Sequence, residues 1–172
     1  MIARPVDGTT GERDNPSMFD VCFATAPDEL DQARMLFREY ADQVDAPCCF
    51  ATFDSEVASL PGEYAPPAGR LFLARRGSEA AGCVAMRRLD AASGEMKRLY
   101  VRPAFRRDRL GRTLAKLVIA SAREQRYRRL LLDTLPKMQE AITLYRSLGF
   151  AERGPYCDEP TPGAVFFELS LS

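Results

Sequence analysis

The stretch that decides the fold is Gly94–Glu124, which reads GEMKRLYVRPAFRRDRLGRTLAKLVIASARE. Its first residues alternate apolar and polar side chains as far as Val101, which predicts a strand, and Pro103 then turns the chain. After an arginine-rich loop, apolar side chains recur at helical spacing, at Leu110, Leu114, Leu117 and Val118. The first backbone N–H groups of such a helix lack intrahelical partners and lie at the positive end of its dipole. A strand that turns into a helix in this way can hold an anion.

The residues of this turn distinguish it from other phosphate-binding loops. The chain has no G-x-x-x-x-G-K-[ST] sequence, which excludes a nucleotide triphosphatase loop, and no G-x-G-x-x-G follows a strand, which argues against a dinucleotide fold. Instead the turn reads Arg106-Arg107-Asp108-Arg109-Leu110-Gly111-Arg112. It resembles the [RQ]-x-x-G-x-[GA] signature with which the GNAT superfamily of N-acetyltransferases binds the pyrophosphate of acetyl-coenzyme A, with Arg106 first and Gly111 last. Arg109 stands where the superfamily usually has its first glycine, and we expect it to keep a negative φ.

The resemblance covers roughly Phe19 to the end of the chain. The segment E-M-K-R-L-Y-V-R-P resembles the central strand of many GNAT proteins, and D-T-L-P-K-M-Q-E-A-I-T-L-Y-R-S-L-G-F resembles their next strand and helix. It implies an α/β fold with a mixed, mostly antiparallel central sheet, flanking helices and the element order β-α-α-β-β-β-α-β-α-β-β.

Periodicity and turn residues place the individual elements. Gly77-Ser78 predicts a hairpin, a second turn at 92–94 leads into the central strand, and Gly149 ends the last helix. The stretch 62–69, with Pro66 and Pro67, reads as an irregular loop. We expect strands at 19–25, 71–75, 80–88, 95–101, 130–134, 150–153 and 164–171, and helices at 28–44, 54–60, 110–124 and 137–148.

Length and composition predict one domain at 19–172, preceded by a disordered polar tail at 1–18. The chain has 172 residues, 46% of them hydrophobic, enough for one core and few for two. No apolar run approaches the roughly 20 residues of a membrane span, and the first residues lack the apolar core of a signal peptide. We therefore expect a cytoplasmic protein that does not bind membranes.

Histidine is absent, which excludes Ser-His-Asp and Cys-His nucleophiles and the usual histidine-containing metal sites. The five cysteines form no C-x-x-C pair, so we expect buried or half-buried free thiols and no metal site. They are Cys22, Cys48, Cys49, Cys83 and Cys157.

Charge is distributed unevenly along a chain that is neutral overall. Residues 97–129 contain 12 basic and two acidic side chains, a net charge of +10, so the remainder carries −10. Nucleic acid is an alternative anionic partner, but the basic residues flank a strand and a helix instead of forming a stripe interleaved with aromatic residues. We therefore expect no nucleic-acid partner.

The resemblance implies acetyl-CoA as the acetyl donor. Backbone N–H groups of residues 107–112 would hold the pyrophosphate, arginine side chains would pair with the phosphates, and the pantetheine arm would lie along residues 99–101. The cofactor-binding set implied is Leu99, Tyr100, Val101, Arg106, Arg107, Asp108, Arg109, Leu110, Gly111 and Arg112.

Two residues are candidates for proton transfer. By resemblance, Tyr145 is the general acid for the departing thiolate, and its alternative role is that of a half-buried core tyrosine. Glu95, at the start of the central strand, could take the proton of the amine, or could simply pair with Lys97 or Arg98. In a regular strand Glu95, Lys97 and Leu99 share one face, and a bulge would change this.

These features predict an N-acetyltransferase that moves an acetyl group to a primary amine, small molecule or peptide, by direct attack in a ternary complex. Acidic residues near the acceptor side would suit a cationic amine, namely Asp42, Asp45, Asp54, Glu56, Glu63, Asp158 and Glu159. The alternative is a non-catalytic acyl-CoA-binding or regulatory domain of the same fold. The resemblance also implies a homodimer, since pairs are common in the superfamily.

Overall fold

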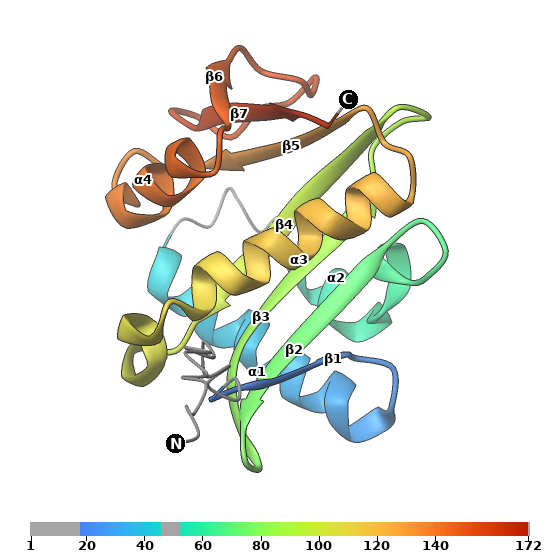
Figure 1. Ribbon diagram of the computed structural model, residues 1–172, viewed down its shortest axis with the longest axis vertical. Coiled ribbons are helices and arrows are strands. Elements are labelled where there is room, and N and C mark those ends of the chain that lie inside the picture. Colours follow the sequence, from blue (N-terminus) through green and yellow to red (C-terminus); the bar gives the residue numbers. More distant parts are fainter. Residues whose placement is uncertain (1–17, 46–51, 172) are drawn as a thin grey trace, which may run out of the picture.

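The computed structural model describes residues 18–45 and 52–171, and Figure 1 shows their arrangement. Residues 1–17 of the polar tail expected at 1–18 lie outside the described residues, as do Cys48 and Cys49. None of the helices in the described ranges is long and apolar enough to cross a membrane.

The predicted element order is confirmed in the described part of the chain. The strands are β1 (Asp20–Phe23), β2 (Arg70–Arg76), β3 (Glu79–Arg88), β4 (Ser93–Val101), β5 (Arg129–Thr134), β6 (Ala151–Arg153) and β7 (Val165–Ser170). The α-helices are α1 (Pro27–Val44), α2 (Phe53–Ser59), α3 (Leu110–Glu124) and α4 (Gln139–Ser147), with short 3₁₀ helices η2 (Gly62–Tyr64) and η3 (Pro103–Asp108). The strands form one mixed sheet in the order β1-β2-β3-β4-β5-β7-β6.

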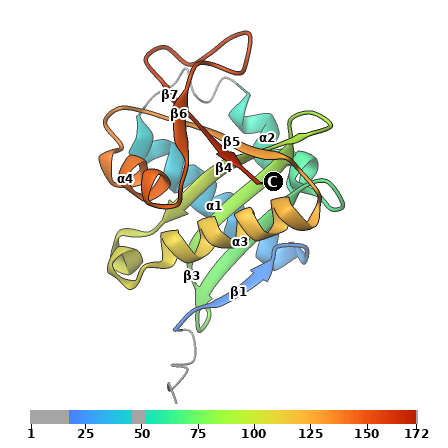
Figure 2. The ribbon, with the colours of Figure 1, turned by 45° about the horizontal axis from the view of Figure 1, so that its top comes forward.

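Helices cover both faces of the sheet, so the core has two layers. In Figures 1 and 2, α3 crosses one face while α1 and α2 lie behind the other. Alternating residues of β3 supply both layers: Val84 and Met86 pack with α3, whereas Cys83 and Ala85 pack with α1 and α2. Helix α4 contributes its buried residues to the layer of α3.

Strands β4 and β5 pair only at their beginnings. Their parallel register runs from Ser93–Arg129 to Glu95–Leu131 and is the one parallel pairing in the described sheet. Farther along, the two strands separate, as Figure 1 shows. This separation leaves the last residues of β4 without a strand neighbour on that side, which is where the site described below lies.

A β-bulge in β4 changes which side chains face which layer. Its register to β3 shifts where Arg98 adopts a positive φ of 58°. Leu99 consequently packs with the layer of α3, opposite to Glu95 and Lys97, so the regular alternation does not hold through Leu99. Arg98 itself is fixed by a two-pronged ion pair with Glu56 of α2, at 2.6 and 3.0 Å.

The structure corrects four local predictions. The arginine-rich loop is the 3₁₀ helix η3, and 62–69 begins with the 3₁₀ helix η2, anchored by the buried Tyr64, whose hydroxyl donates to Glu56. Cys83 is buried and Cys22 half-buried as expected, but Cys157 is exposed. Arg109 has a φ of +57°, contrary to the negative φ expected, because the chain reverses direction there between η3 and α3.

Candidate active site

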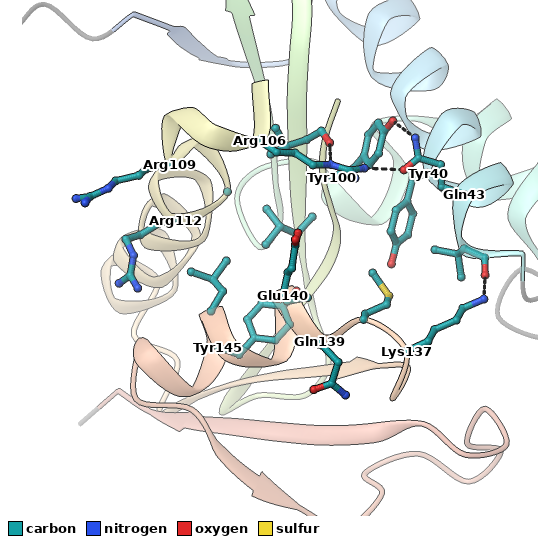
Figure 3. Close-up of a pocket in the computed structure, with 17 residues that line it drawn as sticks. Tyr40, Gln43, Tyr100, Arg106, Arg109, Arg112, Lys137, Gln139, Glu140 and Tyr145 are labelled. Atoms are coloured by element: carbon teal, nitrogen blue, oxygen red, sulfur yellow. Dashed lines mark hydrogen bonds between the residues drawn. The ribbon is translucent and has the colours of Figure 1, made fainter. Parts of the chain in front are cut away.

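A long cleft opens where β4 and β5 separate, between the last turns of α1, the start of α3 and the start of α4 (Figure 3). Its volume is about 1070 Å³, enough for a ligand of cofactor size. In Figure 3, Arg109 and Arg112 extend from the start of α3 at one end, while Tyr40 and Lys137 lie at the other. Its lining is Tyr40, Gln43, Val44, Leu99, Tyr100, Val101, Arg106, Arg109, Gly111, Arg112, Lys137, Met138, Gln139, Glu140, Ala141, Leu144 and Tyr145.

The start of α3 presents uncapped backbone N–H groups to this cleft. No side chain of the described residues caps the helix, and the first backbone bond across its start is from Thr113 N to Arg109 O, at 3.2 Å. The amides before Thr113 are therefore available to an anion. A Cβ at Gly111 would meet only Leu144 and Val101, each at 3.8 Å, so the fold itself does not demand a glycine there.

The arginines of the turn divide into two groups. Arg109, exposed at the cleft, forms no side-chain hydrogen bond or ion pair with another described residue, and Arg112 donates to Ser147 Oγ. Arg106 is already engaged, because its Nε donates to Val101 O at 3.0 Å and its Nη2 to Gln43 Oε1 at 2.6 Å (Figure 3). Only Arg109 thus presents an unengaged guanidinium to the cleft among the described residues.

The side chains of three residues that were predicted to bind the cofactor do not line the cleft. Arg107 is exposed on η3, away from the lining. Asp108 forms an ion pair with Arg76, whose guanidinium stacks on the Phe105 ring at 4.7 Å. Leu110 is 1% exposed and belongs to the core. Asp108 and Leu110 therefore fix the turn instead of lining the cavity.

The end of β4 forms one wall of the cleft through Leu99, Tyr100 and Val101, the segment predicted to lie beside the pantetheine arm. The Tyr100 ring packs in the layer of α1, and its hydroxyl accepts a hydrogen bond from Gln43 Nε2 at 2.8 Å. Because β5 has diverged, this edge can accept an extended ligand alongside it.

Tyr145 lies at the junction of the main cleft and a smaller pocket. Its ring packs between Phe150 and Phe167, with centroids 5.8 and 6.2 Å away, and 7% of the residue is exposed. Burial raises the pKa of its hydroxyl, and the neighbouring Tyr40 and Asp133 add to the rise. The phenol therefore stays protonated near neutral pH and can donate.

Glu95 lies outside the residues that line either space. Its side chain is 3% exposed and accepts hydrogen bonds from Arg87 Nε at 2.6 Å and from the Tyr156 hydroxyl at 2.9 Å. Lys97 Nζ is 3.6 Å away, whereas Arg98, the other partner considered, pairs with Glu56. Burial alone would raise the Glu95 pKa, but the charges of Lys97 and Arg87 outweigh it and lower the pKa, which weakens Glu95 as a base.

A sequence profile described as the acetyltransferase (GNAT) family matches residues 30–150. The chain belongs to this family. An uncharacterized N-acetyltransferase of Schizosaccharomyces pombe is 36% identical over 159 residues, covering 91% of this chain and 98% of the relative. Among solved structures, an acetyltransferase from Streptococcus agalactiae superposes with a TM-score of 0.76 at 20% identity, covering 89% of this chain and 98% of that one. A putative acetyltransferase from Salmonella typhimurium, solved with acetyl-CoA, has a TM-score of 0.68 at 17% identity over 90% and 94% of the two chains.

This acetyltransferase therefore belongs to an enzyme family that uses acetyl-CoA, and its fold is the one predicted from the sequence. Sequence reasoning missed several residues of the cleft: Tyr40 and Gln43 in the last turns of α1, and Lys137 before α4. It also missed Asp133 at the end of β5, which lines the smaller pocket with Tyr145. Tyr40 and Gln43 are three residues apart and so lie on one face of a helix, and this spacing was the signal in the sequence that could have placed both residues in the site.

Proposed function

We propose that the chain transfers an acetyl group from acetyl-CoA to a primary amine, small molecule or peptide, by direct attack within a ternary complex. The observation that carries the proposal is the continuous cleft from the uncapped start of α3 to Tyr145. One end supplies backbone donors and Arg109 for a diphosphate, and the other supplies a buried phenol for a leaving group.

In this proposal each part of the site has one task. The amides before Thr113 and the guanidiniums of Arg109 and Arg112 hold the diphosphate. The exposed edge of β4 at Leu99–Val101 orients the pantetheine arm, and a backbone N–H there stabilises the oxyanion formed on attack. Tyr145 donates its proton to the thiolate as the C–S bond breaks.

Glu95, predicted as the base, has a different place in the proposal. With both carboxylate oxygens already contacted, we assign it the role of holding Lys97 and the loop that carries Tyr156 on the acceptor side. Glu56 and Glu63, predicted to attract a cationic acceptor, likewise already pair with Arg98 and Arg87.

Two measurements test the proposal. Isothermal titration should detect acetyl-CoA binding, and thiol release should appear with at least one member of a panel of primary amines. Absence of binding at sub-millimolar acetyl-CoA would refute the placement of the donor. Binding without thiol release across the whole panel would instead favour the non-catalytic acyl-CoA-binding domain.

A further inference from the structure

A second pocket, of about 70 Å³, lies in the gap between β4 and β5 and shares Tyr145 with the main cleft. An ion pair crosses this gap. Lys97 and Asp133 each lie two residues beyond the last paired positions, Glu95 and Leu131, so both side chains emerge on one side where the strands separate. Lys97 Nζ is 3.4 Å from Asp133 Oδ1.

Asp133 is more accessible than the other carboxylate near this gap. Its side chain is 24% exposed, compared with 3% for Glu95. In the described part of the chain, the long contact with Lys97 is the one ion pair or hydrogen bond that reaches the Asp133 carboxylate. Asp133 therefore has unfilled acceptor capacity facing the pocket, whereas both oxygens of Glu95 are engaged.

The pocket is small, which limits what can enter it. Its volume corresponds to about two water molecules at roughly 30 Å³ each. The group that suits such a space best is therefore an amino group on an unbranched methylene carbon. The acceptor must also reach the thioester end of the cleft, and Tyr145, the proposed general acid, is one of the residues that line both spaces.

We propose that Asp133 binds the amino group of the acceptor and takes its proton during acetyl transfer, and that the acceptor is a primary amine on an unbranched carbon. This inference rests on the proposed function and adds to it the acceptor class and the proton-accepting residue. Glu95 then acts on the site through Lys97 and Tyr156, as a positioning residue.

The proton balance is as follows. An alkylammonium acceptor, with a pKa near 10.4, first gives one proton to Asp133, which releases it to solvent. The free amine attacks the acyl carbon, the N–C bond forms, and the C–S bond breaks. Tyr145 gives its proton to the departing thiolate. The second proton of the nitrogen returns through solvent to the Tyr145 phenolate, which restores both residues. An acceptor that is already neutral does not need the first of these steps.

The groups around Asp133 suit this role. The positive charge of Lys97 disfavours a second cation beside it and so favours the neutral, nucleophilic amine. The charge of Asp133 also acts on Tyr145 of α4 and on the loop between β6 and β7. Among the described residues, Lys97, Arg98, Tyr40 and Tyr145 are the charged and titratable groups that line the pocket with Asp133. Its charge also acts on Tyr156 and Cys157, and Glu95 is joined to it through Lys97.

The test compares two isosteric acceptors: the best alkylamine of the panel, R–CH₂–NH₂, and its aminooxy analogue, R–O–NH₂, which is uncharged at pH 7. Asp133→Asn should lower kcat/KM for the alkylamine about 100-fold at pH 7, but by less than about fivefold for the analogue. The remaining alkylamine activity should rise with pH as the free amine fraction grows. Asp20→Asn, an exposed acid on β1 outside both pockets, should change neither rate.

Acetyl-CoA affinity and the melting temperature of Asp133→Asn are measured alongside. If Asp133→Asn does not fold, Lys97→Met serves instead and should move the alkylamine pH profile, but not the aminooxy profile, to higher pH. Unchanged rates in Asp133→Asn, equal losses with both acceptors, or an unmoved profile in Lys97→Met would overturn this inference alone. Wild-type protein that binds acetyl-CoA yet acetylates no amine would overturn the proposed function itself.

Discussion

Adding a single methyl group at Gly111 should separate cofactor binding from stability. The glycine lies in the first turn of α3, has no positive φ, and lines the cleft. In Gly111→Ala, the new Cβ would meet Leu144 and Val101 at 3.8 Å, an ordinary van der Waals distance. The protein therefore has room for the methyl group. The same methyl group would, however, keep a diphosphate from approaching the α3 amides closely.

The two effects have opposite signs. Alanine is favoured over glycine in a helix interior by up to about 1 kcal/mol, so the variant should be as stable as the wild type or slightly more stable. Hydrogen bonds to a charged group contribute about 1.5–3 kcal/mol each, so losing one close amide contact should weaken acetyl-CoA binding roughly 10- to 150-fold.

Isothermal titration with acetyl-CoA and a thermal melt provide both readouts. Gly154→Ala is the matched control, because its Cβ would have open space and Gly154 does not line the cleft. We expect unchanged affinity in the control. Undiminished affinity in Gly111→Ala would refute the assignment of the α3 start as the diphosphate site, and lower affinity with a lower melting temperature would refute the packing argument.

Three further predictions concern single residues. Tyr145→Phe keeps the ring between Phe150 and Phe167, so turnover should fall at least about tenfold with acetyl-CoA affinity kept, and an unchanged rate would remove Tyr145 from the reaction. Arg109→Gly relieves the positive φ of 57°, so the melting temperature should rise about 2–4 °C for a gain of about 1 kcal/mol, whereas Arg107→Gly, within η3, should give no rise. The Glu95 pKa lies below its ordinary value of 4.5, so Glu95 contributes stability above that pH, and the contribution is lost as the pH falls through the lowered pKa. Glu95→Gln should therefore melt below the wild type at pH 7 by an amount that shrinks toward pH 3, and a constant difference would contradict the ion-pair assignment.

Periodicity was sufficient to predict the order of the elements. The strands at 80–88 and 95–101 and the helix at 110–124 each bury one side or both, and burial leaves a strong pattern in the sequence. The positive φ at Arg109 and the bulge at Arg98 leave no such pattern, because in each case an arginine occupies a conformation that the surrounding structure imposes.

The site could be predicted only where it coincides with a local motif. The α3 start, the end of β4 and Tyr145 lie in contiguous segments whose residues resemble those of a family, and all three line the cleft. Asp133 was missed because its proximity to Lys97 depends on how far β4 and β5 diverge, which is a property of the sheet. Asp108 was predicted to bind the cofactor because it lies within the same local motif, although its carboxylate pairs with Arg76 from a strand distant in the sequence.

Neighbouring residues at the end of α1 join opposite walls of the cleft. Gln43 accepts from Arg106 at the turn before α3, and the backbone oxygen of Val44 accepts from Lys137 before α4 (Figure 3). The last turn of α1 is thus hydrogen-bonded both to the donor side of the cleft and to the segment before the helix that carries Tyr145. A ligand that widens the cleft has to break one of these two hydrogen bonds, so ligand binding is coupled to the position of α1.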